Sequence, residues 1–88
     1  MKIFIQFLFA FLIWDSIRDS FGYHIFRASS ITDTFFLIDT ITGNSNASYT
    51  DPFGVPENCY QVRAWADSVT SEPSNTACIP LPPPPPLR

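Results

Sequence analysis

The chain has 88 residues, of which 45% are hydrophobic, 16% are aromatic and only 15% are charged. A chain of this length can bury one small core, so we expect a single folded domain, and a composition this apolar excludes a disordered chain. The formal net charge of -3 provides no basic field for a phosphate backbone, so nucleic acid is excluded as an expected partner.

The first predicted element lies in an apolar run, residues 3–14, which follows Lys2 and has Gln6 as its only polar interruption. The run has the outline of a secretory signal segment, but no small-x-small cleavage site follows it. It is shorter than the roughly 20 residues that span a bilayer, so we expect no transmembrane segment. Because a polar stretch bounds the run, residues 10–14 predict a strand that ends in a core Trp14, with the signal segment as the alternative.

The next predicted strand covers residues 21–27, where apolar and polar positions alternate with period two. This alternation directs Tyr23 and Ile25 toward the core. It places His24 and Phe26 on the outer face of the sheet.

Two further strands are predicted on either side of a cluster of turn formers. Residues 35–41 are rich in aromatic and β-branched side chains, although their inward and outward positions are ambiguous. Residues 47–50 predict a short strand with Tyr49 as its apolar anchor. The two prolines in residues 51–56 remove ladder donors, so this stretch predicts a crossover loop.

The last two predicted strands are residues 58–66 and 74–79, joined by a polar hairpin loop at residues 67–73. Six short strands without a helical period predict a sandwich or a barrel. The alternation places Cys59, Gln61, Arg63, Trp65 and Cys78 on the outer side of these strands. The predicted core consists of Trp14, Tyr23, Ile25, Tyr49, Tyr60, Val62, Ala77 and Ile79.

The two cysteines, Cys59 and Cys78, are too few and too widely separated for a structural zinc site, and the only histidine is His24. If the last hairpin folds symmetrically about residues 68 and 69, the two cysteines face each other at a site where Cα atoms lie about 4.5 Å apart. This register predicts a disulfide and a location outside the reducing cytosol. The alternative is two free thiols in a cytosolic protein.

Five short fragments that follow one another along the chain carry a family resemblance. They are Leu12-Ile13-Trp14, Gly22-Tyr23-His24-Ile25-Phe26-Arg27, Ser48-Tyr49-Thr50-Asp51, Cys59-Tyr60-Gln61-Val62-Arg63-Ala64 and Ser71-Glu72-Pro73-Ser74-Asn75-Thr76. Together they resemble the fibronectin type III family in the form found in secreted bacterial proteins. The resemblance implies an all-β, immunoglobulin-like β-sandwich over residues 1–80, followed by a proline-rich linker or tail at residues 81–88.

Three features depart from the family pattern. No first strand is visible before Ala10, so the domain either lacks that strand or forms it from residues 2–7. Asn58 stands where many members carry a corner tyrosine, so either Tyr60 takes over that role or the corner is lost. The chain has no Arg-Gly-Asp tripeptide, so the resemblance does not imply integrin binding.

Candidate chemistry is sparse. His24 has no nucleophile or second acid supplied by a motif. The pairs Asp15 and Asp19, or Asp39 and Asp51, could suggest paired carboxylates for glycoside hydrolysis, but acidic residues in turns are explained by loop closure. We therefore expect no enzyme, with no catalytic, cofactor-binding or metal-binding residue. Trp65 and Phe26, with Phe36 as a further candidate, predict an outward aromatic platform for a partner chain or a sugar ring, and the alternative is that a neighbouring domain covers them.

These features predict a non-catalytic spacer and interaction module of a larger protein at the cell surface or outside the cell. Its expected partners are neighbouring domains or extracellular proteins. The alternative function is a carbohydrate-associated accessory domain of a secreted hydrolase, with a polysaccharide as the partner.

Overall fold

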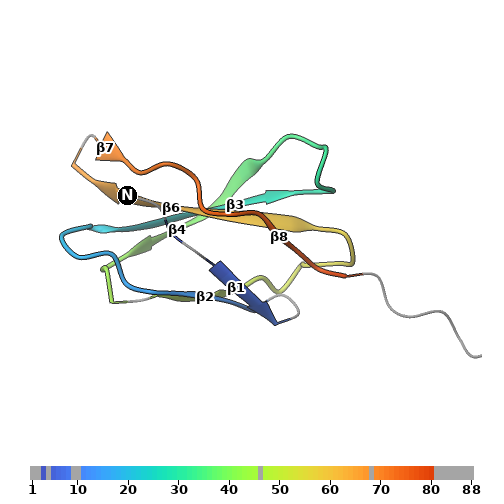
Figure 1. Ribbon diagram of the computed structural model, residues 1–88, viewed down its shortest axis with the longest axis horizontal. Helices are drawn as coiled ribbons and strands as arrows, with labels where there is room; N and C mark the ends of the chain where they lie inside the picture. Colours follow the sequence, from blue (N-terminus) through green and yellow to red (C-terminus); the bar gives the residue numbers. More distant parts are fainter. Residues whose placement is uncertain (1–2, 4, 9–10, 46, 68, 81–88) are drawn as a thin grey trace, which may run out of the picture.

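The computed structural model describes residues 3, 5–8, 11–45, 47–67 and 69–80 (Figure 1). These residues form eight strands in two sheets that lie face to face, and none of them is helical. The expected all-β architecture is confirmed over the described part of the chain. That part also contains no helix long and apolar enough to cross a membrane. The predicted proline-rich linker at residues 81–88 lies outside the described residues.

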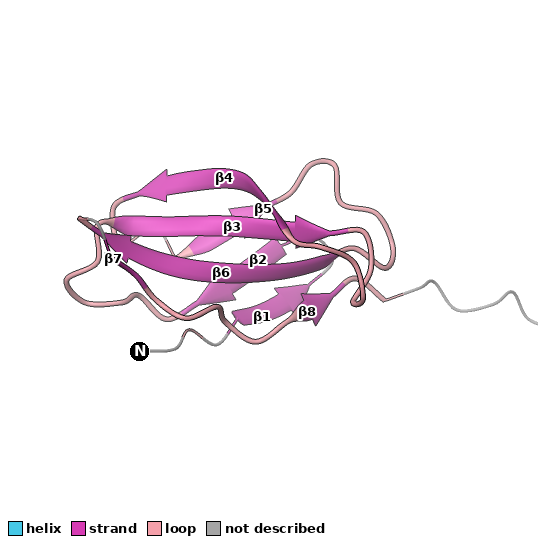
Figure 2. Ribbon diagram, turned by 90° about the horizontal axis from the view of Figure 1, so that it is seen from above, coloured by secondary structure: helices cyan, strands magenta, loops and turns pink. Residues whose placement is uncertain are grey.

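The smaller sheet has three antiparallel strands in the order β1-β2-β5 (Figure 2). They are β1 (Ile5–Leu8), β2 (Phe11–Trp14) and β5 (Ser48–Thr50). Strand β2 agrees with the strand predicted at residues 10–14, although Ala10 lies outside the described residues. A strand does precede β2, since Ile5 of β1 pairs with Trp14 of β2. The expectation of a missing first strand is therefore corrected in favour of its alternative, a first strand formed from the N-terminal apolar run.

The larger sheet has five strands in the order β4-β3-β6-β7, and β8 also pairs with β6. They are β3 (Gly22–Ala28), β4 (Phe36–Thr42), β6 (Cys59–Ala66), β7 (Val69–Thr70) and β8 (Ala77–Cys78). Strands β3 and β6 form its centre and pair along seven residues. At the start of β3, a Cβ atom on Gly22 would lie 1.9 Å from the carbonyl oxygen of Ile41, so only glycine fits at this approach of β4.

The segment that follows β6 differs from the prediction: β7 forms inside the predicted hairpin loop 67–73, and β8 covers only two residues of the predicted strand 74–79. Strand β6 advances five residues from Tyr60 to Trp65, whereas the opposite side needs seven residues from Thr70 to Ala77. The hairpin is therefore not symmetric about residues 68 and 69. Because of the two extra residues, Cys59 still lies opposite Cys78 at the far end of the hairpin, as predicted.

Two serines bridge the gap between β7 and β8. The side-chain oxygen of Ser71 accepts the N–H of Ala64 at 2.9 Å, and that of Ser74 accepts the N–H of Val62 at 2.8 Å. Their backbone N–H groups donate to the carbonyl oxygens of the same two residues. Hydroxyl groups thus replace carbonyl acceptors where the return strand is irregular, so that both buried donors of β6 are satisfied.

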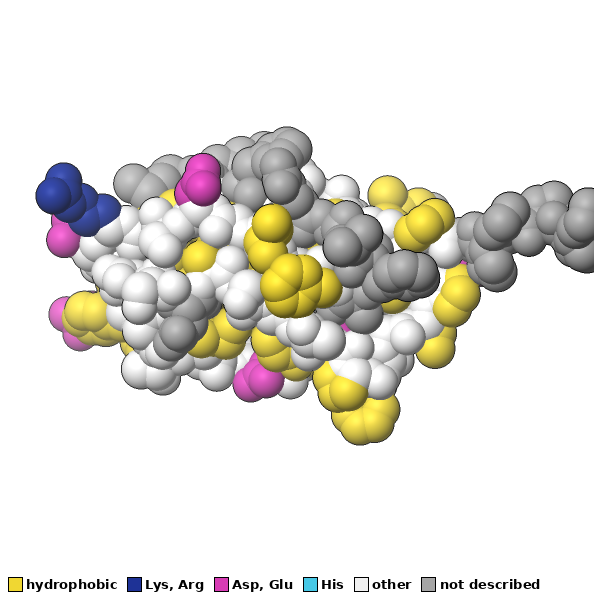
Figure 3. All heavy atoms as spheres, turned by 90° about the horizontal axis from the view of Figure 1, so that it is seen from below, with side chains coloured by type: hydrophobic (Ala, Val, Ile, Leu, Met, Phe, Trp, Pro, Cys, Tyr) yellow, Lys and Arg dark blue, Asp and Glu magenta, His cyan; other side chains and the backbone are white. Residues whose placement is uncertain are grey.

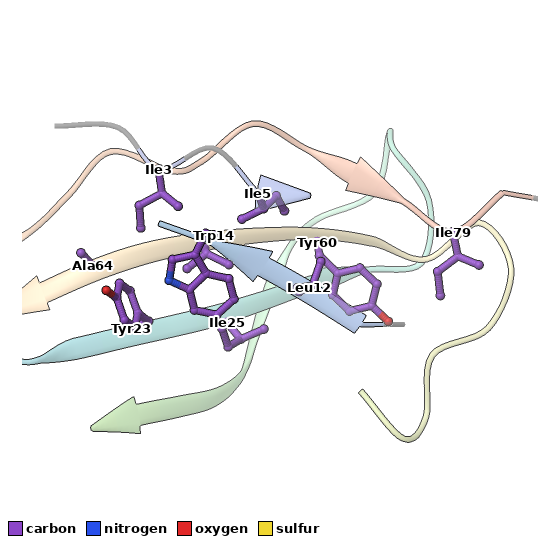
Figure 4. Close-up of a cluster of buried hydrophobic side chains, with 10 residues drawn as sticks. Ile3, Ile5, Leu12, Trp14, Tyr23, Ile25, Tyr60, Ala64 and Ile79 are labelled. Atoms are coloured by element: carbon purple, nitrogen blue, oxygen red, sulfur yellow. The ribbon is translucent and has the colours of Figure 1, made fainter. Parts of the chain in front are cut away.

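The core lies between the two sheets, where the inward positions of β2, β3 and β6 meet (Figure 4). Tyr49 and Ala77, both predicted in the core, are only partly buried, because they belong to the short edge strands β5 and β8. They pack against the cluster from its rim. The buried cluster consists of Ile3, Ile5, Leu12, Trp14, Tyr23, Ile25, Tyr60, Val62, Ala64 and Ile79.

One flank of the sandwich is closed by a single side chain. The backbone N–H of Ile5 donates to Oδ1 of Asn75 at 2.7 Å, and Nδ2 of Asn75 donates to the carbonyl oxygen of Ile5 at 3.3 Å. The amide of Asn75 therefore acts as a substitute strand partner for β1. It joins the edge of the smaller sheet to the segment between β7 and β8 of the larger one.

Candidate binding face

The outer face of the larger sheet carries a row of rings across β3 and β6. Because side chains alternate along a strand, the burial of Tyr23 and Ile25 sends His24 and Phe26 outward. Trp65 of β6 lies on the same outer face, at the end of the sheet where Phe21 precedes β3. We call this set the aromatic row: Phe21, Trp65, His24 and Phe26.

Successive members of the aromatic row touch one another. The rings of Phe21 and Trp65 meet edge to face with centroids 5.7 Å apart. Trp65 and His24 lie nearly parallel at 5.8 Å, with an angle of 18° between their planes, and His24 meets Phe26 edge to face at 6.5 Å. These separations fall within the range in which aromatic pairs attract each other beyond their area burial. The rings of the row therefore support one another on the outer face of the sheet.

A guanidinium group extends the row. The Cζ atom of Arg63 lies 5.6 Å from the centroid of Phe26, within cation–π distance. Arg63 pairs across the sheet with His24, while Phe26 pairs with Gln61, so Arg63 and Phe26 are diagonal neighbours. The one salt bridge among the described residues joins other side chains. The charge of Arg63 is thus stacked on a ring without a carboxylate partner in the described part of the chain.

The members of the row differ in exposure. Phe21 is exposed, whereas Trp65, His24, Phe26 and Arg63 are half-buried. The indole Nε1 of Trp65 is buried and lacks a hydrogen-bond partner, so the ring presents its carbon surface and not its polar atom. Phe36, the third candidate for the platform, is not in the row: it lies on the edge strand β4 opposite Arg27 and is 67% exposed.

The opposite face of the molecule is also apolar in part. Figure 3 shows it from the side of the smaller sheet, where hydrophobic side chains appear among polar surface with a few charged side chains. The outward residues of β2 that contribute to it, Phe11 and Ile13, are each 40% exposed. No ring contact between described residues joins aromatic side chains of this face into a row. The outer face of the larger sheet therefore carries rings in contact with one another, whereas the face of the smaller sheet carries exposed apolar side chains without such contacts.

A buried polar cluster connects β3, β6 and the crossover loop. Oδ2 of Asp51 accepts hydrogen bonds from the hydroxyl of Tyr60 and from Arg27, each at 2.7 Å, and Oδ1 accepts the N–H of Phe53 at 3.0 Å. The side chain of Asp51 is 2% exposed and that of Arg27 is 31% exposed. Tyr60 thus joins its strand to the crossover loop by a hydrogen bond. Of the two alternatives given for the corner tyrosine, the structure has the one in which Tyr60 takes over that role.

The hydrogen bonds of this cluster set its protonation. Burial raises the pKa of Asp51, but the hydrogen bonds from Tyr60 and Arg27 outweigh it and bring the pKa below its usual value. Burial, followed by the hydrogen bond to Asp51, raises the pKa of Tyr60. The charged carboxylate and the neutral phenol are therefore the stable forms. Sequence alternation identified Tyr60 as a core residue but gave no signal that Asp51, on the preceding loop, is its hydrogen-bond partner.

Replacing Tyr60 by phenylalanine is expected to cost about 2 kcal/mol at neutral pH, because Asp51 loses a hydrogen bond to its charged form. The stability from Asp51 is present above its unfolded pKa of about 3.9 and is lost as the pH falls through the lower folded value. The substitution raises the folded pKa toward the unfolded value, so the loss of stability on acidification should become smaller and should be complete at a higher pH. Urea unfolding from pH 3 to pH 7 measures both effects.

The matched control is Tyr23→Phe. The hydroxyl of Tyr23 is also buried, but it accepts the N–H of Ile17 and donates to the carbonyl oxygen of Asn44, so both partners are uncharged. This variant should lose stability by a similar amount without moving the acid limb of the curve. An unchanged acid limb for Tyr60→Phe would contradict the role assigned to Asp51.

The predicted disulfide is confirmed between Cys59 and Cys78, whose Cα atoms lie 3.9 Å apart. Cys59 is on the outer side of β6 as predicted, yet it is only 1% exposed. The bridge holds the two-residue strand β8 against the end of β6.

The residues considered for catalysis do not converge. Nδ1 of His24 lies 3.0 Å from Oγ1 of Thr40 on the outer face. Asp39 and Asp51 line one groove of about 520 Å³ at the flank of the sandwich between β4 and β5, but Asp51 is bound as described above. Among the described residues, no three His, Cys, Asp or Glu side chains are placed to hold a metal ion. Comparison with protein-family models, with curated proteins and with solved structures finds no match for this chain.

Proposed function

We propose that this chain is a non-catalytic extracellular interaction and spacer module of the fibronectin type III kind, and that it binds its partner through the aromatic row. The observation that carries the proposal is the row itself, with Arg63 over the ring at its end, on the outer face of the larger sheet. Planar side chains that are already held in place lose little conformational entropy when a partner covers them, which is why they recur at binding sites.

The family assignment is supported by the arrangement of the strands. Two antiparallel sheets face each other, the crossover loop carries the chain from β5 to β6, and the two sheets enclose a single core. The extracellular location is supported by the disulfide, because such bonds persist where the redox environment is oxidising. The spacer role is supported by the opposite placement of Ile3 and Ile79 along the core (Figure 4).

A carbohydrate-associated accessory domain is the second candidate function. It is favoured by the same aromatic row, because pyranose rings pack their apolar faces on aromatic side chains. A module that binds only proteins through this face would not be retained by a polysaccharide. Retention of the chain by a polysaccharide therefore separates the two candidates.

Sedimentation with insoluble cellulose, chitin and starch tests this choice. An interaction module with a protein partner should remain in the supernatant with all three polymers. An accessory domain should sediment with at least one of them, and the Trp65→Ala variant should remain in the supernatant. The control Phe53→Ala removes an aromatic side chain that is 77% exposed on the crossover loop and should change neither result. Retention that both variants preserve would contradict binding through the aromatic row.

A further inference from the structure

We propose that the aromatic row binds an acidic polysaccharide, with the uronate carboxylate on Arg63 and the faces of the sugar rings on Phe26 and Trp65. This inference rests on the second candidate function, the carbohydrate-associated accessory domain, because it names the ligand class of the same face. It adds to that function a charge requirement, which the aromatic side chains alone do not impose.

The first argument is the charge of the face. Strands β3 and β6 contain no Asp or Glu, although the whole chain has 8 acidic residues against 5 Lys and Arg. The one acidic residue in the larger sheet is Asp39 of β4, which pairs with the inward Ile25 and lines the groove between β4 and β5. The centre of the outer face is therefore basic on a protein of net charge -3, and an anionic ligand complements it.

The second argument is the state of Arg63. The contact with Phe26 places the guanidinium group over the ring, while the lack of a carboxylate partner leaves its N–H donors available. A guanidinium group is suited to a carboxylate, because its N–H groups can form two parallel hydrogen bonds to the two oxygens. A ligand carboxylate would supply the missing anion without displacing an existing ion pair.

The third argument separates a sugar polymer from an acidic peptide. Strand β3 pairs with β4 and β6, and β6 pairs with β3, β7 and β8, so the backbone groups beneath the row are already used. An extended peptide gains affinity mainly from main-chain hydrogen bonds at a sheet edge, which this face does not offer. A sugar chain needs only ring faces, side-chain polar groups and the charge. Gln61, whose Nε2 donates to Oγ1 of Thr76 at 2.8 Å, provides polar atoms beside Phe26.

The test uses the oxidised full chain and soluble polymers in affinity electrophoresis. The probes are polygalacturonate, its fully methyl-esterified form, which has the same sugar chain without charge, and poly-L-glutamate, which has the carboxylates without sugar rings. We expect retardation by polygalacturonate alone. Arg63→Gln should weaken the binding by about tenfold or more, the value of a charge-assisted hydrogen bond, and Arg63→Lys should restore part of it. Phe26→Leu should weaken it also.

Two controls separate this site from general effects of charge and aromatic content. Arg88→Gln removes the same charge near the end of the chain, and Phe53→Leu removes an exposed ring from the crossover loop; both should leave the binding unchanged. Thermal unfolding of each variant shows that loss of binding is not loss of fold.

The outcomes that overturn the inference are distinct. Equal binding of the methyl ester would remove the charge requirement while leaving the face as a carbohydrate site. Equal binding of poly-L-glutamate would show that charge alone, or an acidic peptide, is recognised. Absence of binding to all three probes would overturn the inference, and the proposed interaction with a protein partner would stand on its own sedimentation test.

Discussion

Replacing Trp14 by alanine is expected to lower the free energy of unfolding by about 3–5 kcal/mol, a large part of the stability of a small domain. Trp14 is buried where the two sheets meet, and its ring packs edge to face on Tyr23 with centroids 5.1 Å apart. Its loss leaves a cavity bordered by both sheets. Urea unfolding of the oxidised protein measures the effect.

Two controls make this prediction specific. Ile13→Ala alters the neighbouring residue on the outward side of β2 and should cost less than about 1 kcal/mol. Trp14→Phe keeps an aromatic ring and removes an indole Nε1 that has no hydrogen-bond partner, so its cost should be well below that of alanine. Equal losses for Trp14→Ala and Ile13→Ala would show that β2 does not pack in the core.

The sequence predicted the centre of the fold because alternation is clearest where one face of a strand is buried. Residues 21–27 and 58–66 correspond closely to β3 and β6, and their inward and outward sides follow the pattern. The pattern fails at the N-terminus, where the run 3–14 is almost uniformly apolar. Without polar residues to mark the outward positions, period two is invisible, and a first strand could be predicted only as an alternative over residues 2–7, where the structure has Ile5–Leu8.

The last part of the chain was predicted less well for a different reason. Strand β7 lies in the predicted loop 67–73, and the two-residue β8 covers only part of the predicted strand 74–79, because the serine side chains, and not a regular ladder, carry the pairing between them. A serine in an extended segment gives no sign of whether its hydroxyl replaces a carbonyl acceptor. The length of the irregular stretch therefore could not be predicted from spacing alone.

The candidate site could be predicted in part. Alternation placed Trp65 and Phe26 on the outer face, where the structure has them, and the sequence grouped them with Phe36 as a platform. It did not identify His24 as the ring that connects them. Their connection through His24 depends on the register between β3 and β6, since Gly22 pairs with Trp65 and His24 lies two residues farther along the strand. The contact of Arg63 with Phe26 is a diagonal neighbour relation of the same register. Once that register is known, the whole row follows from it.

Removal of the disulfide is expected to lower the free energy of unfolding by about 3 kcal/mol, because the bridge joins residues 19 apart in the chain and restricts the unfolded state. The loss should concentrate at one end of the sandwich. Strand β8 has only two residues paired with β6, and the core residue Ile79 follows it directly. Reduction should therefore release β8 and expose this end of the core before the centre of the sheet unfolds.

The double variant Cys59→Ala, Cys78→Ala provides the comparison, since alanine avoids placing a hydroxyl where Cys59 is buried. Its stability should equal that of the reduced natural chain, and hydrogen exchange should show early loss of protection at residues 57–60 and at Ile79, with β3 retained. The oxidised chain should contain no titratable thiol. Two titratable thiols under oxidising conditions, or equal stability of all three forms, would contradict the bridge and remove the main support for an extracellular location, because the aromatic row is compatible with any compartment.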